Sequence, residues 1–261
     1  MAHRIELSPF AARLCREASP LFLTGAAPGC GVGFVADLLN ASGRFAIYDS
    51  NPLLCETLPA VVAEHSARAR GAQTSPPAGA RALFLAAGGR GGGPGAPPDG
   101  ALAAGALDAF YAFVARYEAD SRLLGRGIWG MEHLFADMSA AIRLVNLVPN
   151  ARVVFVGRGL DGTLAAARAA GEAPGPGPDG DDAVAETWTR NMEAAARLAE
   201  EDWFLNLSHE ASVADPALAL ARVERFLGGR RLRRGAVAAE AAGRPRAVAA
   251  DPRRLAGPSG G

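Results

Sequence analysis

A glycine-rich stretch between residues 21 and 40, LFLTGAAPGCGVGFVADLLN, holds the residues best suited to bind an anion. A short apolar run precedes the glycines, and apolar residues at helical spacing follow them. This order predicts a strand, a tight turn and a helix, in which backbone N–H groups and the helix N-terminus hold a phosphate. The residues expected to form this anion site are Gly25, Gly29, Cys30, Gly31, Val32 and Gly33.

The side chains that usually accompany such a loop are missing. A Walker-type loop places Lys and then Ser or Thr after its last glycine, whereas Val32 and Gly33 follow Gly31 here. The dinucleotide pattern GxGxxG also fails, because its third glycine falls on Phe34. The stretch therefore predicts binding of an anion by the backbone, and a glycine-rich turn that binds nothing is the alternative.

Composition limits the class of protein. The chain has 261 residues, 49% of them hydrophobic and 21% charged, with a formal net charge of zero. These values indicate a globular protein and argue against a general nucleic-acid binder. The sequence contains no lysine, so that a phosphate ligand must be Arg, His or backbone. The three cysteines lack metal-site or disulfide spacing, and no apolar run is long enough to span a membrane, which predicts a cytoplasmic protein.

Strands and helices are predicted to alternate along the chain. The expected strands are 21–23, 45–48, 81–87, 152–156 and 203–207, and the expected helices are 11–17, 34–40, 53–70, 101–117, 135–148, 161–170, 183–200 and 216–227. This alternation predicts a three-layer α/β fold with a central, mostly parallel sheet flanked by helices. We expect one domain over residues 1–228, with low-complexity loops at 71–100 and 171–182, and a disordered tail over 229–261.

Several stretches together resemble the sulfotransferase family that uses 3′-phosphoadenosine-5′-phosphosulfate (PAPS). The glycine-rich stretch resembles the family's 5′-phosphosulfate loop, and LVPNARVVFVGRGLDGTLAA at 147–166 resembles the segment that carries the 3′-phosphate ligands. HEASVADPALALARVERFLG at 209–228 resembles the family segment YEDLVADPEATLRRIxxFLG, and Trp129-Gly130 resembles its WGDK element. These pieces have the family's order and cover roughly residues 20–228. The resemblance implies a P-loop-like fold.

The same resemblance implies an activity and a set of ligands. The reaction would be transfer of a sulfuryl group from PAPS to a hydroxyl or amine of a small-molecule or glycan acceptor, without a metal. Arg158 would bind the 3′-phosphate, Ala166 falls where the family has Ser, and Trp188 lies where the family often has a Trp that stacks on adenine. The loop departs from the family, because its basic residue is Gly29 and its Ser is Cys30.

Sulfuryl transfer needs a general base, and the sequence offers two candidates. Asp49 follows the second predicted strand, near the position of a catalytic Glu in related enzymes, and is the first candidate; an Asx turn is the alternative. Glu132 and His133 form a second acid/base pair, which polar residues at the start of a helix would also explain. Cys30 is either a reactive thiol at a helix N-terminus or a replacement for serine in the loop.

Two other functions are compatible with these residues. A loop that lacks the family's basic and hydroxyl side chains is also typical of a catalytically inactive binding module that keeps the sulfotransferase fold. The loop APGCGVG resembles the APGSGKG loop of nucleotide kinases, although the absence of lysine makes this the weaker alternative. The acceptor and the oligomeric state are left open.

Overall fold

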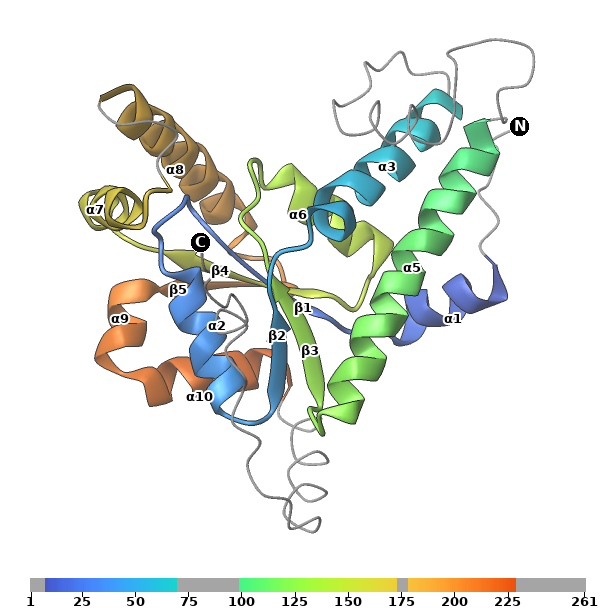
Figure 1. The fold of residues 1–261 in the computed structure, drawn as a ribbon, viewed down its shortest axis with the longest axis horizontal. Coiled ribbons are helices and arrows are strands. Elements are labelled where there is room, and N and C mark those ends of the chain that lie inside the picture. The colour runs from blue at the N-terminus through green and yellow to red at the C-terminus, as the bar shows by residue number, and fades with distance from the viewer. Residues whose placement is uncertain (1–7, 70–98, 173–177, 229–261) are drawn as a thin grey trace, which may run out of the picture.

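A five-stranded parallel sheet forms the centre of the protein (Figure 1). The computed structural model describes residues 8–69, 99–172 and 178–228. Its strands are β1 (Leu21–Gly25), β2 (Phe45–Tyr48), β3 (Ile128–Glu132), β4 (Arg152–Gly157) and β5 (Phe204–Ser208). They lie in the order β2-β3-β1-β4-β5, and every neighbouring pair is parallel. The carboxyl ends of all these strands therefore meet at one edge of the sheet.

Helices cover both faces of the sheet (Figure 1). One layer contains α1 (Pro9–Glu17), α3 (Leu58–Ala69), α5 (Asp99–Leu123) and α6 (Ser139–Leu147), and the other contains α2 (Val32–Ala41), α9 (His209–Ala214) and α10 (Pro216–Phe226). The π-helical turn η1 (Leu53–Thr57) leads into α3, and α7 (Leu160–Ala170) packs on α8 (Pro178–Leu198). The predicted three-layer α/β fold with a parallel sheet is confirmed. In the described part of the chain, no helix is long and apolar enough to cross a membrane.

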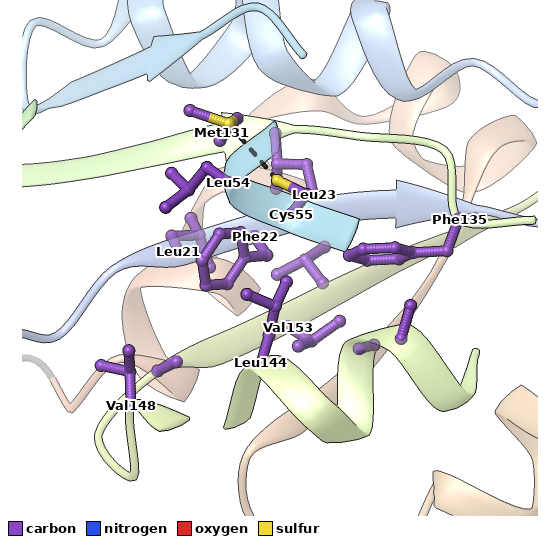
Figure 2. Close-up of a cluster of buried hydrophobic side chains, with 14 of the residues drawn as sticks. Leu21, Phe22, Leu23, Leu54, Cys55, Met131, Phe135, Leu144, Val148 and Val153 are labelled. Atoms are coloured by element: carbon purple, nitrogen blue, oxygen red, sulfur yellow. Dashed lines mark hydrogen bonds between the residues drawn. The ribbon is translucent and has the colours of Figure 1, made fainter. Parts of the chain in front are cut away.

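The sheet is buried because its central strands are apolar along their whole length. All five residues of β1 are buried, and so are the four inner residues of β4. Figure 2 shows side chains of these strands, such as Phe22 and Val153, packed against Leu144 of α6 and Leu54 of η1. The Cys55 thiol lies 3.4 Å from the sulfur of Met131 on β3. This packing fixes the carboxyl edge of the sheet, where the loops diverge.

One central strand differs from the prediction. Residues 128–132 form β3 between β2 and β1, although the sequence predicted no strand there. The helix predicted from 135 begins only at Ser139, whose N–H donates to Oδ1 of Asp137 at 2.8 Å. The strand predicted at 81–87 and the tail at 229–261 lie outside the described residues.

Candidate functional site

A cleft of about 520 Å³ opens at the carboxyl edge of the sheet. This is the position at which open α/β sheets bind ligands. The residues lining the cleft come from the glycine-rich loop, from the ends of β2, β3 and β4, and from α7. They are Gly29, Cys30, Gly31, Val32, Gly33, Phe34, Ser50, Glu132, His133, Leu134, Arg158, Ala166, Ala170 and Glu172.

The glycine-rich loop has a backbone that other residues would disturb. Gly29 and Gly31 have φ angles of +81° and +91°. A Cβ on Gly29 would lie 2.5 Å from the Thr163 carbonyl oxygen, and a Cβ on Gly31 would lie 2.0 Å from Cδ2 of His209. Gly31 is the N-cap of α2, and no side chain caps this helix. The N-terminus of α2 thus presents N–H groups and a partial positive charge at the cleft.

Replacement of Gly31 by alanine is expected to destabilise the fold by about 2–4 kcal/mol, because the positive φ is unfavourable for alanine and the new methyl group meets the His209 ring. Thermal or urea unfolding measures this loss. Gly105→Ala is the matched control, because a Cβ at this exposed position of α5 has open space around it. The control should leave stability unchanged or raise it by about 0.5–1 kcal/mol. Equal stabilities for the two variants would contradict the loop geometry.

Arg158 follows β4 directly and is tied to the glycine-rich loop. Its Nη1 donates a hydrogen bond to the Gly29 carbonyl oxygen at 3.1 Å. The Arg158 carbonyl oxygen accepts a hydrogen bond from Nε1 of Trp188 at 2.8 Å, and the next N–H, of Gly159, donates to Glu210 at 3.0 Å. A guanidinium has five N–H donors, so Arg158 keeps donors for a ligand while the loop and α8 hold it in place.

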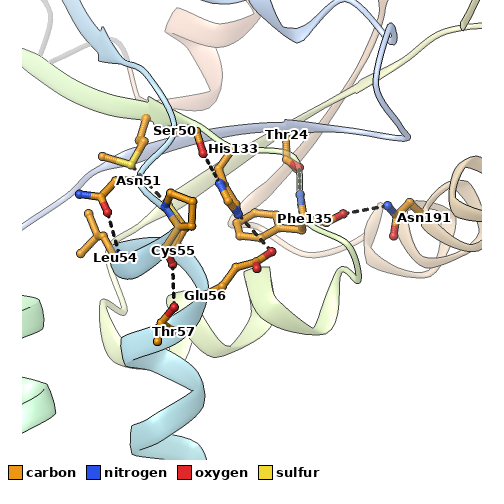
Figure 3. Close-up of polar contacts among 12 residues, drawn as sticks. Thr24, Ser50, Asn51, Leu54, Cys55, Glu56, Thr57, His133, Phe135 and Asn191 are labelled. Carbon is orange, nitrogen blue, oxygen red and sulfur yellow. Dashed lines mark hydrogen bonds and ion pairs between the residues drawn. The ribbon is translucent and has the colours of Figure 1, made fainter. Parts of the chain in front are cut away.

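His133 lies directly after β3 and is 6% exposed. Its backbone N–H donates to the Leu23 carbonyl oxygen of β1 at 2.8 Å. In the ring, Nδ1 lies 2.6 Å from Oγ of Ser50, and Nε2 lies 3.1 Å from Oε1 of Glu56 (Figure 3). The ring also meets Phe135 edge to face, with centroids 4.9 Å apart. The imidazole is thus held on three sides and lines the cleft.

Glu132 brings a carboxylate to the anion site. Its Oε2 is buried, has no hydrogen-bond partner among the described residues, and lies 4.0 Å from the Cβ position of Gly33. Burial raises the pKa of Glu132, and the nearby charges of Asp49, Asp37 and Glu172 raise this pKa further. An anion bound at the loop would favour the protonated form of Glu132.

The structure brings most of the predicted site residues together, and the exceptions lie close by. Gly25 is beneath the loop, where a Cβ would lie 2.1 Å from the Cys30 sulfur. Asp49 is exposed, and neither Asp49 nor Trp188 is among the described residues that line the cleft. Burial raises the pKa of the Cys30 thiol, which disfavours a reactive thiolate there.

Sequence reasoning missed several residues that form the site. Ser50 was read only as part of a turn, and Glu56 only as part of a helix. Asn191 of α8 is 1% exposed, and its Nδ2 donates at 3.1 Å to the carbonyl oxygens of both Ala26 and Phe135, which joins the segments after β1 and β3. Figure 3 shows the bond to Phe135. A polar residue on one face of a helix gave no signal for this role.

Comparison with known proteins finds similarity only among solved structures. No protein-family profile and no curated protein matches the chain. The sulfotransferase domain of the olefin synthase from Synechococcus PCC 7002 shares 16% identity over 82% of this chain and 74% of that domain, with a TM-score of 0.43. The sulfotransferase domain from the curacin biosynthetic pathway shares 12% identity over 81% and 74%, with a TM-score of 0.47. Retinol dehydratase in complex with androsterone and the inactive cofactor PAP shares 13% identity over 90% and 66%, with a TM-score of 0.40. At sequence identities this low, structural similarity does not show that two proteins share an activity.

Proposed function

We propose that this chain is a sulfotransferase-type enzyme that transfers a sulfuryl group from PAPS to a hydroxyl or amine of a small-molecule or glycan acceptor. The supporting observation is the composition of the cleft, in which the uncapped N-terminus of α2, the guanidinium of Arg158 and the buried imidazole of His133 occur together. The first two are suited to bind negative charge, and an imidazole nitrogen can act as a general base.

The residues of the cleft fit an anionic donor at its two charged ends. The N–H groups at the start of α2 would hold the 5′-phosphosulfate, and they would stabilise charge that develops on the leaving phosphate. The free donors of Arg158 would hold the 3′-phosphate, beside Ala166, which faces the same cleft. PAPS supplies an activated sulfuryl group whose sulfur–oxygen bond to phosphate breaks on transfer.

His133 is better placed than Asp49 to act as the general base. The charge of Glu56, whose Oε1 lies 3.1 Å from Nε2 without a hydrogen bond to it, favours a proton on Nε2, which leaves Nδ1 as the proton acceptor. Ser50 Oγ lies 2.6 Å from Nδ1, so the Ser50 side chain would rotate away to let an acceptor hydroxyl reach this nitrogen. The acceptor oxygen would attack sulfur while Nδ1 removes its proton, and Glu56 would stabilise the imidazolium. Asp49 acts on the cleft through its charge, which raises the pKa of Glu132.

The product nucleotide 3′-phosphoadenosine-5′-phosphate (PAP) tests the donor site directly. We expect calorimetric titration to give micromolar binding of PAP and weaker binding of ATP–Mg²⁺. Transfer from ³⁵S-labelled PAPS to 2-naphthol, to a simple alcohol and to an alkyl amine then tests the reaction. Absence of PAP binding would contradict the enzymatic proposal and favour a binding module that keeps the fold. Binding of ATP–Mg²⁺ alone would favour the kinase-like alternative.

Glu132→Gln is expected to strengthen PAP binding about fivefold at pH 8. The change removes a negative charge beside the loop, whose repulsion of the bound phosphate costs about 1 kcal/mol. The effect should shrink as the pH falls. In the wild-type protein the carboxylate takes up a proton as the pH approaches its raised pKa, so that the two proteins become alike. Titrations at several pH values measure this difference. Glu186→Gln, a change of the same kind on the exposed side of α8, is the control. A gain that is constant with pH would contradict the assignment.

A further inference from the structure

We propose a second activity for the same cleft: Ser50 is a nucleophile, activated by His133 and Glu56, that takes an acyl group from a carboxylic ester. The activity needs no sulfuryl donor and does not rest on the function proposed above. The three residues, here called the Ser50 relay, lie in the order hydroxyl, imidazole and carboxylate (Figure 3). This order is the one by which serine hydrolases activate their nucleophile.

The Ser50 hydroxyl is within hydrogen-bond distance of the His133 ring, whereas Glu56 lies within ion-pair distance of the ring without a hydrogen bond to it. Ser50 Oγ lies 2.6 Å from Nδ1 of His133, and Nε2 of the same ring lies 3.1 Å from Oε1 of Glu56. The ring nitrogens are exchanged relative to the trypsin-like arrangement, but each still performs one role, because a neutral imidazole has one donor and one acceptor nitrogen. Ser50 is exposed and lines the cleft, whereas His133 is buried. The hydroxyl is therefore accessible while its base is held in place.

The sheet register brings the relay together. Tyr48 of β2 is paired with Met131 of β3. Ser50 and His133 each lie two residues further along parallel strands, so that both side chains reach the same point beyond the sheet. The Ser50 turn is fixed by the next residue, because Oδ1 of Asn51 accepts from the Leu54 N–H at 3.2 Å and its Nδ2 donates to the Tyr117 hydroxyl at 3.1 Å.

Glu56 reaches His133 from an unusual element. It lies in η1, a π-helical turn at the start of α3. Such turns are rare and occur frequently at functional sites. The wider turn costs stability, so it is retained mainly where a particular side-chain position is needed. The turn places the Glu56 carboxylate beside a buried ring, where its charge would stabilise the imidazolium.

The reaction balances with the ester and water alone. Ser50 Oγ attacks the carbonyl carbon, and its proton moves to Nδ1 of His133. The imidazolium returns this proton to the leaving alcohol as the ester carbon–oxygen bond breaks, which leaves an acyl group on Ser50. Water then attacks this acyl group and gives a proton to Nδ1, and the imidazolium returns that proton to Ser50 Oγ as the acyl carbon–oxygen bond breaks, which releases a carboxylic acid and free Ser50. Phe34 and Leu134 line the same cleft and are partly exposed, which favours a short apolar acyl group.

Labelling and hydrolysis test the proposal on the intact chain without any nucleotide. A fluorophosphonate probe is expected to add one mass increment, and peptide mapping should place it on Ser50. Hydrolysis of p-nitrophenyl butyrate should fall at least about 100-fold in Ser50→Ala and in His133→Gln. Glu56→Gln keeps the size of the side chain, and it should lower kcat about tenfold with KM unchanged, because Glu56 positions and stabilises the imidazole without touching substrate.

Ser139→Ala is the matched control, because it removes a serine hydroxyl from the start of α6, outside the cleft. It should keep the wild-type rate, and circular dichroism verifies that each variant folds. The proposal would be overturned by labelling at another residue, by no labelling, or by an unchanged rate in Ser50→Ala. Peptide mapping on the wild-type protein gives a decisive result even if a variant fails to fold. PAP binding does not enter this experiment, so failure of the sulfuryl-transfer proposal is recognised separately.

Discussion

Arg158→Ala is expected to weaken PAP binding at least about 100-fold. Arg158 is the one arginine among the described residues that line the cleft. Charge-assisted hydrogen bonds contribute about 1.5–3 kcal/mol each, and the loss of two such bonds lowers affinity by two powers of ten or more. Calorimetric titration with PAP measures the change directly, and raised salt should reduce the difference between the two proteins because part of the interaction is electrostatic.

Two further variants complete this test: one separates the charge of Arg158 from its hydrogen-bonding geometry, and the other is a control at a different arginine. Arg158→Lys keeps the charge but loses the planar arrangement of donors, so we expect an intermediate loss of affinity. Arg222→Ala removes an exposed arginine that donates to the Asn206 carbonyl oxygen of β5 and does not line the cleft, so PAP binding should be unchanged. An Arg158→Ala protein that binds PAP as the wild type does would place the phosphate elsewhere.

The parts of the fold that were predictable from the sequence are those set by local pattern. The prediction located β1 and β4, with the turns that follow them, to within two residues. A short apolar run followed by glycine is compatible with few structures other than a buried strand and a turn. Arg158, which the family resemblance implied as a site residue, directly follows such a run. Local pattern was sufficient there because each element carries its own signal.

The strand β3 had no such signal. Its centre is Gly130, and glycine normally weakens a strand. The structure explains this residue, because a Cβ there would lie 2.2 Å from the Leu21 carbonyl oxygen of β1. The close approach of two backbones requires a residue without a side chain. That requirement depends on which strand lies alongside, and this information is not contained in the local sequence.

The missed strand also hid the contact between Ser50 and His133. Ser50 and His133 are 83 positions apart, and they meet only because β2 pairs with β3 in one register. The sequence predicted Glu132 and His133 as the second acid/base pair, behind Asp49, and gave no reason to bring His133 next to Ser50. A shift of one residue in this pairing would turn every side chain to the opposite face and separate the two groups.

His133→Gln is expected to lower sulfuryl transfer from PAPS to 2-naphthol by about 10²–10⁴-fold, which is the usual contribution of a general base. Glutamine keeps a polar side chain of similar length but cannot accept the proton. The affinity for PAP should stay within about twofold, because the ring holds Ser50 and Glu56 rather than the loop. Steady-state rates with the labelled donor, together with PAP titration of the same variant, separate loss of chemistry from loss of binding.

Asp49→Asn distinguishes the two candidate bases that the sequence offered. Asp49 is exposed, whereas His133 is buried at the end of β3, so the asparagine variant should keep transfer within about threefold of the wild type. Its affinity for PAP should stay close to that of the wild type, because the loss of the Asp49 charge is offset by a lower pKa of Glu132, which leaves more negative charge on Glu132. Loss of transfer in Asp49→Asn with full activity in His133→Gln would reverse the assignment. In that case His133 would take no part in sulfuryl transfer, and the Ser50 relay would serve only the proposed ester hydrolysis.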